Sequence, residues 1–157
     1  MAHKQNTTAA RNIALCYVRK SWVKDDTDLV SPEIQRRNIQ RVCDTNGWTP
    51  EWHEDVEGHK SGMHEKNRPG WLEVKARLRD GDIAALVAND LSRLHRRGWR
   101  IGDLLDFVDS HGVRLVLADP AKQMDFSTPQ GRMFAQLTAI FDEWYAMDVS
   151  QRRKANI

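Results

Sequence analysis

IALCYVRKS, residues 13–21, changes from an apolar run to a charged and hydroxylated end. Six largely apolar residues without polar alternation are typical of a strand that is covered on both faces, as in a parallel sheet. Arg19 and Ser21 follow this run, so a possible nucleophile and a permanent cation lie together at its end. Because arginine keeps its charge and binds phosphate oxygens through two hydrogen bonds, this pair suits chemistry on a phosphodiester.

Three more runs have the composition of strands, and helical patterns separate them. The other strand candidates are residues 48–54, 83–88 and 113–118. The helix candidates run from Ser31-Pro32 to Gly47, from about Pro69 to Arg79, over roughly 98–110, and from Thr128-Pro129 onward. This alternation predicts an open α/β sheet with right-handed crossovers, and the continuously apolar runs indicate mostly parallel strands flanked by helices.

Length and composition predict one soluble domain. The chain has 157 residues, of which 40% are hydrophobic and 29% charged. No apolar stretch approaches the roughly 20 residues that span a bilayer, so no membrane partner is expected. Residues 1–11 are polar and lack a signal sequence, which predicts a flexible segment and a cytoplasmic protein with reduced Cys16 and Cys43 in the core. The net charge of +2 does not by itself indicate nucleic-acid binding.

Polar residues follow three strand candidates. Arg19 and Ser21 follow the first, Asp55 the second, and Ser92, Arg93 and Arg96 the third. In open α/β sheets, sites gather at the carboxyl ends of the strands. We therefore expect these segments to converge on one edge of the sheet and to form a phosphate site.

Two further residues admit both a functional and a structural interpretation. Gln35 shares a helix face with Ile39 and Val42, so it points inward and needs a partner. A phosphate, the Ser21 hydroxyl or a structural hydrogen bond could each serve. Arg68 stands directly before Pro69 and is either an ordinary helix-start residue or part of the phosphate site.

A different enzyme class remains open. Asp55, Asp90 and Asp119 could bind magnesium in a metal-dependent nuclease, since carboxylates near strand ends are ligands for that ion. Arginines converging on the same edge disfavour a divalent cation there. The histidines match no zinc spacing, and no Gly-rich phosphate loop occurs, so we expect neither a metal nor a cofactor.

The last helix candidate, within residues 128–157, carries a heptad-like seam. Met133, Leu137, Ile140, Trp144 and Met147 are spaced 4, 3, 4 and 3 residues apart, and Phe134, Phe141 and Tyr145 form a second strip. The seam predicts contact with a partner helix, although one broad core face is the alternative. The sequence ends without a helix stop signal, so we expect a truncated helix that belongs to a longer polypeptide.

Taken in order, these residues resemble the catalytic domain of serine recombinases, the resolvase/invertase superfamily. The chain looks most like the amino-terminal domain of a large serine integrase. The matching pieces are YVRKS at 17–21, SPEIQ at 31–35, Asp55, Ser61-Gly62, NRPGW at 67–71, GDI at 81–83, SRLHR at 92–96 and DFSTPQGR at 125–132. The resemblance covers about residues 12–157 and makes 12–127 the catalytic core. It also implies carboxy-terminal DNA-binding domains, which are absent from this sequence.

The resemblance implies a mechanism and a set of partners. Ser21 would attack a DNA phosphate to form a 5′-phosphoserine link, and strands would be exchanged and rejoined without metal or ATP. The remaining implied active-site residues are Arg19, Arg68, Arg93 and Arg96 around the phosphate, with Gln35, Asp55 and Arg152 in support. The implied partners are double-stranded attachment-site DNA and further copies of the chain, as homodimers and homotetramers through residues 128–157, in a bacterial host cell.

The chain departs from the family pattern in two places. Many members carry an aspartate where this chain has Ser92, so an orienting carboxylate is absent there, and Asp90 is the candidate to compensate. A glutamate common on the long helix falls near Tyr145. These departures give some weight to a catalytically silent dimerisation module of the same fold.

Overall fold

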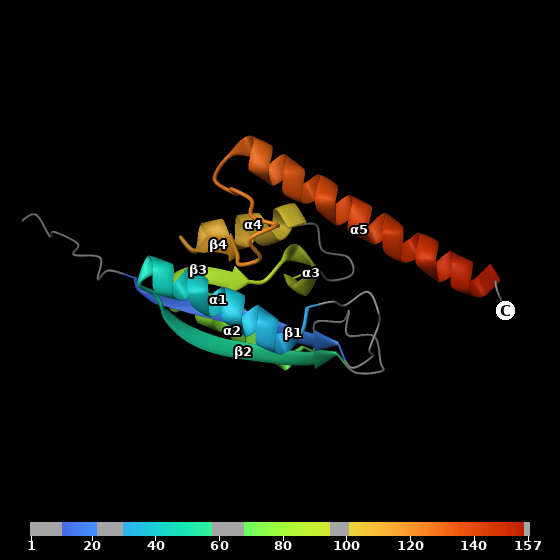
Figure 1. Cartoon of the computed structure of the whole chain (residues 1–157). Helices are drawn as coiled ribbons and strands as arrows, with labels where there is room; N and C mark the ends of the chain where they lie inside the picture. Colours follow the sequence, from blue (N-terminus) through green and yellow to red (C-terminus); the bar gives the residue numbers. More distant parts are fainter. Residues whose placement is uncertain (1–10, 22–29, 58–67, 95–100, 156–157) are drawn as a thin grey trace, which may run out of the picture.

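The computed structural model describes residues 11–21, 30–57, 68–94 and 101–155. Its sheet consists of β1 (Ile13–Ser21), β2 (Thr49–Glu57), β3 (Ile83–Ala88) and β4 (Arg114–Leu117). All neighbouring strands are parallel, in the order β2-β1-β3-β4 (Figure 1). The prediction of an open parallel α/β sheet is confirmed.

The helices begin and end close to their predicted limits. They are α1 (Pro32–Asn46), α2 (Pro69–Leu78), α3 (Leu91–Leu94), α4 (Ile101–Ser110) and α5 (Pro129–Ala155). At the start of α1 the Ser31 hydroxyl accepts a hydrogen bond from the Ile34 backbone N–H at 3.3 Å, as an N-cap residue does. At its end Gly47 has a φ of 69°, a left-handed conformation that favours glycine. The four-residue α3 was not predicted.

The two longest strands run further than their apolar runs. β1 and β2 pair in register from Ile13 opposite Thr49 to Ser21 opposite Glu57, with Arg19 opposite Asp55. Arg19, Ser21 and Asp55 therefore lie within strands, not after them as predicted. Ladder hydrogen bonds are made by the backbone, so pairing continues through polar side chains at the end of a strand.

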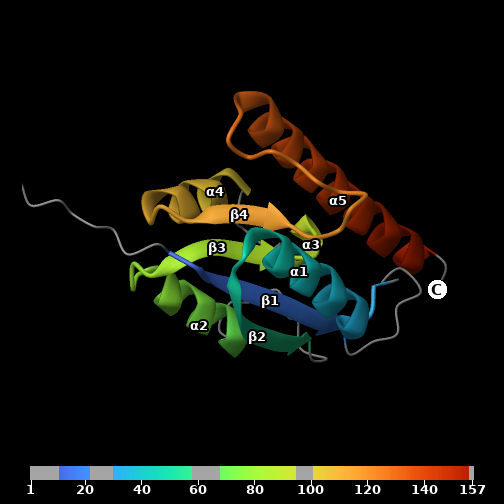
Figure 2. The same cartoon turned by 60° about the vertical axis from the view of Figure 1, so that its left-hand side comes forward.

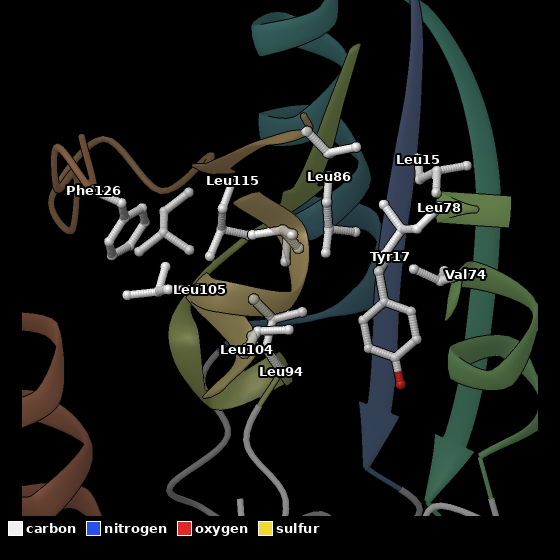
Figure 3. Packing of buried hydrophobic residues seen from close by; sticks show 14 of the residues in the cluster. Leu15, Tyr17, Val74, Leu78, Leu86, Leu94, Leu104, Leu105, Leu115 and Phe126 are labelled. Carbon is white, nitrogen blue, oxygen red and sulfur yellow. The ribbon is translucent and has the colours of Figure 1, made fainter. Parts of the chain in front are cut away.

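Helices cover both faces of the sheet (Figure 2). The larger cluster of buried side chains joins β1, β3 and β4 to α2, α3 and α4 (Figure 3). The smaller cluster joins the other face to α1, where Cys16 and Cys43 are buried free thiols with their sulfur atoms 3.6 Å apart. Both cysteines are thus small core residues, as predicted, and burial raises the pKa of each thiol.

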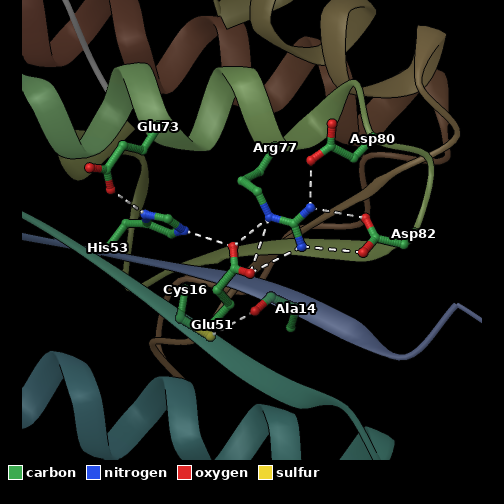
Figure 4. A network of polar contacts seen from close by, with 8 residues as sticks. All are labelled: Ala14, Cys16, Glu51, His53, Glu73, Arg77, Asp80 and Asp82. Atoms are coloured by element: carbon green, nitrogen blue, oxygen red, sulfur yellow. Dashed lines mark hydrogen bonds and ion pairs between the residues drawn. The ribbon is translucent and has the colours of Figure 1, made fainter.

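Ion pairs attach α2 to the outer strand β2 (Figure 4). Arg77 on α2 binds the Glu51 carboxylate of β2 and the carboxylates of Asp80 and Asp82, and His53 contacts Glu51 and Glu73. Such partly exposed pairs contribute little individually. Their clearer effect is to fix the position of α2 along β2, and the amino-terminal end of α2 borders the candidate site.

The long helix α5 packs only near its start. Ala135 is fully buried, and Arg132 pairs with Asp106 and Asp109 of α4. The predicted seam is exposed in this single chain, by 44% at Leu137 and 63% at Trp144. α5 contacts α3 as well as α4, and Figure 1 shows its carboxyl-terminal part running on beyond both. Among the described helices, none is long and apolar enough to cross a membrane.

Candidate active site

Three arginines are interlocked at the carboxyl end of the sheet. Arg68 donates from Nη2 to the main-chain oxygen of Arg93 at 2.9 Å. Arg93 donates from Nη1 to the main-chain oxygen of Arg19 at 3.2 Å, and Arg19 donates from Nη2 to the main-chain oxygen of Ser92 at 2.9 Å. The segments around β1, α2 and α3 therefore fix one another, and the predicted convergence of these arginines is present.

Gln35 on α1 holds the backbone of Arg19. Its Nε2 donates to the Arg19 oxygen at 3.0 Å and to the Val30 oxygen at 3.2 Å, and its Oε1 accepts from the Arg19 N–H at 3.3 Å. The side chain is completely buried. Of the partners left open by the sequence, the structure shows a structural one: Gln35 positions the end of β1.

Tyr17 connects the acidic and basic parts of the site. Its hydroxyl donates to Asp55 Oδ2 at 2.7 Å and accepts from Arg68 Nη2 at 2.8 Å. Burial raises the pKa of the Tyr17 hydroxyl, and the hydrogen bond to Asp55 raises it further, although the charge of Arg68 acts in the opposite direction. The hydroxyl therefore keeps its proton near neutral pH and serves both neighbours.

Asp55 also caps α2. Its two carboxylate oxygens accept hydrogen bonds from the backbone N–H groups of Gly70 at 2.7 Å and Trp71 at 2.9 Å. Anions are favoured at a helix amino terminus, where such N–H groups lack partners within the helix. Asp55 thus ties β2 to α2 and reaches the arginines through Tyr17.

Arg68 is the most enclosed of the described arginines, with 1% of its surface exposed. Its guanidinium carbon lies 5.4 Å from the ring centre of Tyr17 and 5.7 Å from that of Trp71, within cation–π range. A buried charge is screened less by solvent than a surface charge. Arg68 can therefore add positive potential to the site while it orders the groups around it.

A buried polar chain leads from α1 to Arg93. Asn38 donates to Asn89 Oδ1 at 2.9 Å, and Asn89 donates to Asp90 Oδ2 at 2.9 Å. Asp90 Oδ2 lies 3.8 Å from Arg93 Nε, and its Oδ1 accepts hydrogen bonds from the backbone N–H and the hydroxyl of Ser92. Desolvation by itself raises the pKa of Asp90, but the bonds from Ser92 and Asn89 and the charge of Arg93 lower it overall.

Three further predicted site residues are Ser21, Arg96 and Arg152. Ser21 is the last residue of β1, two positions beyond Arg19 on the same strand. Arg96 lies outside the described residues. Arg152 is exposed near the end of α5 and pairs with Asp148 of the same helix, so the structure does not bring it into the network.

The carboxylates of the magnesium alternative do not gather. Within the described parts of the chain, no three histidine, cysteine, aspartate or glutamate residues form a group that could hold a metal ion. Asp55 accepts hydrogen bonds from Tyr17 and from the start of α2. Asp90 accepts hydrogen bonds from Asn89 and Ser92 and pairs with Arg93. Asp55, Asp90 and Asp119 thus lack the shared site that this nuclease requires.

Sequence reasoning missed three buried polar residues of the site: Tyr17, Asn38 and Asn89. Tyr17 was counted as part of an apolar strand, although a buried tyrosine hydroxyl normally needs a partner. Asn38 follows Gln35 by three residues, which places both on one helix face. That spacing is the signal by which Asn38 could have been found.

A family comparison agrees with this geometry. The family model described as "Resolvase, N terminal domain" matches residues 14–157. The chain belongs to the resolvase family. It is the catalytic domain of a serine site-specific recombinase, and its general role is site-specific recombination. Among curated proteins, none matches the sequence.

Solved structures of resolvase-family proteins share the fold. The N-terminal catalytic domain of TP901-1 integrase matches with a TM-score of 0.58 and 17% identity, over 87% of this chain and 97% of that one. A resolvase family site-specific recombinase from Streptococcus pneumoniae matches with a TM-score of 0.55 and 16% identity, over 92% and 95%. The C-terminal catalytic domain of ISC1926 TnpA, an IS607-like serine recombinase, matches with a TM-score of 0.53 and 21% identity, over 67% and 69%.

Proposed function

We propose that this resolvase-family domain cleaves and rejoins double-stranded DNA through Ser21, in integration and excision of the phage type. The Ser21 oxygen forms a bond to the scissile phosphorus as the bond from phosphorus to the 3′ oxygen breaks. The serine proton leaves to solvent or a base, and the 3′ oxygen takes up a proton. A 5′-phosphoserine and a free 3′-hydroxyl result, and attack by a 3′-hydroxyl of the partner DNA reverses the step.

The observation that carries this proposal is the interlocked arginine set, in which Arg19 lies on the strand that ends in Ser21. Phosphoryl transfer gathers negative charge on the phosphate oxygens, and fixed cations stabilise that charge without reorganisation. We assign this task to Arg19 and Arg93 with Arg96, supported by the buried charge of Arg68. Arg152 would join them from α5 only in an assembly, since its pairing with Asp148 keeps it on its own helix here.

No metal or nucleotide is required by this scheme. The phosphodiester bond energy is kept in the phosphoserine link, so rejoining needs no ATP. The residues that surround the phosphate in the proposal are cations, which take the place of a divalent ion in neutralising charge.

Replacement of Ser21 tests the proposal. The full-length recombinase is incubated with DNA carrying its attachment site in EDTA, quenched with denaturant and analysed by mass spectrometry. We expect a nucleotide adduct on Ser21 in the wild type and none in Ser21→Ala, with DNA binding retained. Ser110→Ala is the matched control. The Ser110 hydroxyl lies at the end of α4 and contacts the Phe107 main-chain oxygen and the His111 ring, outside the candidate site.

Other outcomes would assign the site differently. Cleavage that appears only with magnesium and survives Ser21→Ala would move the chemistry to carboxylates. Absence of cleavage by the wild type under both conditions would favour the silent dimerisation module.

A further inference from the structure

The carboxylate that pairs with Arg93 belongs to Asp90, not to the residue directly before the arginine. The residue directly before it is Ser92, where many family members have aspartate. In this chain Asp90, three residues before Arg93, places its Oδ2 3.8 Å from Arg93 Nε. Both groups are buried, with 3% of Asp90 and 5% of Arg93 exposed. A charged pair in such surroundings is weakly screened, so the two groups attract each other across this distance.

The Asp90 carboxylate is itself fixed on every side that the structure describes. Ser92 donates to Oδ1 from its backbone N–H at 3.0 Å and from its hydroxyl, and Asn89 donates to Oδ2 at 2.9 Å. Asn38 of α1 in turn donates to Asn89 at 2.9 Å. The serine thus does not replace the missing carboxylate but orients the one at position 90.

We propose that Asp90 is the positioning residue of Arg93, with Ser92 and Asn89 as its supports. This inference rests on the proposed function for its consequence on catalysis, but its geometry can be tested without DNA. Asp90 and Arg19 then restrain Arg93 from two directions, through the Nε and Nη1 sides of one guanidinium.

One face of α1 supports two arginines of the site, Arg19 and Arg93. Gln35 fixes the Arg19 backbone, and Asn38, one turn later, fixes the chain that ends at Arg93. Rigid support of this kind matters because a displacement of about 1 Å in a reacting geometry can cost roughly 100-fold in rate. Asp90 acts through Arg93 and need not contact the DNA.

Relocating the carboxylate is the decisive test in the full-length recombinase. Asp90→Asn keeps the shape and removes the charge, and we expect covalent adduct formation to slow by about 10- to 100-fold. Ser92→Ala should slow it by no more than a few fold, because Asp90 remains. The double variant Asp90→Asn/Ser92→Asp should recover most of the lost rate. Equal effects of Asp90→Asn and Ser92→Ala, or no recovery in the double variant, would overturn the proposal.

A second measurement uses the 157-residue chain alone. Carboxyl ¹³C NMR follows the pKa of Asp90, which Arg93 and Lys122 lower by their charges. Arg93→Gln should raise this pKa, whereas Arg41→Gln, which removes an exposed cation from α1, should leave it unchanged. An unaltered pKa in Arg93→Gln would overturn the pairing. Because this readout needs no Ser21 chemistry, it separates failure of the inference from failure of the proposed function.

Discussion

Tyr17 shows how much of the site depends on single hydroxyl and amide groups. One phenol oxygen joins Asp55 to Arg68, and one glutamine amide joins α1 to the main chain of Arg19. Each such group is buried, so removing one partner takes from the other a hydrogen bond that water does not readily replace. Substitutions in this layer should therefore reduce stability and cleavage together.

We expect Tyr17→Phe to lower the free energy of unfolding by about 1–3 kcal/mol, because Asp55 and Arg68 both lose a partner. Urea denaturation of the chain measures the change. Tyr145→Phe is the matched control, since Tyr145 is 58% exposed and should change stability by less than about 0.5 kcal/mol. Equal stability of the two variants would show that the Tyr17 hydroxyl contributes nothing net.

We expect the contribution of Asp90 to the free energy of unfolding to depend on pH in the acid range. Its pKa is lowered in the folded state, so its contribution to stability is complete above the unfolded value of about 3.9 and is lost as pH falls through the lower folded value. The stability difference between the wild type and Asp90→Asn should thus be large at pH 7 and shrink below about pH 4. Urea denaturation across this range measures it.

The control for this pH dependence is Asp106→Asn, which removes an exposed carboxylate paired with Arg132. Its stability difference should be small at neutral pH. A difference for Asp90→Asn that stays constant from pH 7 to acid would contradict the prediction.

At the residue scale, the sequence predicted which arginines converge better than it predicted the hydrogen-bond partners around them. Arg19 and Arg93 could be placed together because parallel strands bring their carboxyl ends to one edge. The partner of Gln35 could not be chosen, since it is a main-chain group whose position depends on how α1 packs on β1. The link from Asp55 to Arg68 was missed because it passes through a tyrosine that hydropathy alone assigns to the core.

At the scale of the elements, the start of α2 packs tightly against β2. A Cβ atom on Gly70 would come within 2.7 Å of the Glu54 main-chain oxygen and 3.0 Å of Asp55 Oδ1. The absence of a side chain there is what lets the Gly70 N–H reach Asp55. The contact between β2 and α2 thus depends on one glycine.

Gly70→Ala should therefore force α2 away from β2 and cost about 1–3 kcal/mol of stability, with slower cleavage because Asp55 and Arg68 shift. Gly102→Ala is the matched control in α4, where a Cβ meets only the end of the flexible Gln136 side chain. Thermal unfolding compares the two. A Gly70→Ala protein as stable as Gly102→Ala would refute the close approach.

The helices and strands were predictable where buried side chains left a clear pattern in the sequence. Continuous apolar runs predicted β1, β3 and β4, and caps such as Ser31 and Gly47 predicted the limits of α1. The polar ends of β1 and β2 were missed because backbone pairing, not hydrophobicity, extends them. The short α3 was missed because it contains only four residues, too few to show a helical period.

At the scale of the whole molecule, α5 carries large apolar side chains that the described parts of the chain leave exposed. Family membership implies oligomerisation, and we propose that the seam from Met133 to Met147 forms the interface between copies. Its large side chains are 44–66% exposed here. Covering such a surface is favourable by roughly 25 cal/mol per Å² of apolar area.

Ile140→Glu should weaken self-association, because it puts a charge at the centre of the seam. Sedimentation of the chain over a range of concentrations measures the change. Gln151→Glu adds the same charge at an exposed position beyond the seam and should have little effect. A wild-type chain that stays strictly monomeric at high concentration would contradict the proposed interface.

The arginines of this site take as acceptors the carbonyl groups of Ser92, Arg93 and Arg19. A peptide carbonyl is present whatever amino acid occupies the position, so the anchor of Arg19 survives any substitution at residue 92 that keeps the backbone in place. An exchange between serine and aspartate at residue 92 would therefore leave this anchor of Arg19 in place. Related sequences should therefore be sought by the spacing of their arginines, and the aspartate should be accepted at either position 90 or position 92.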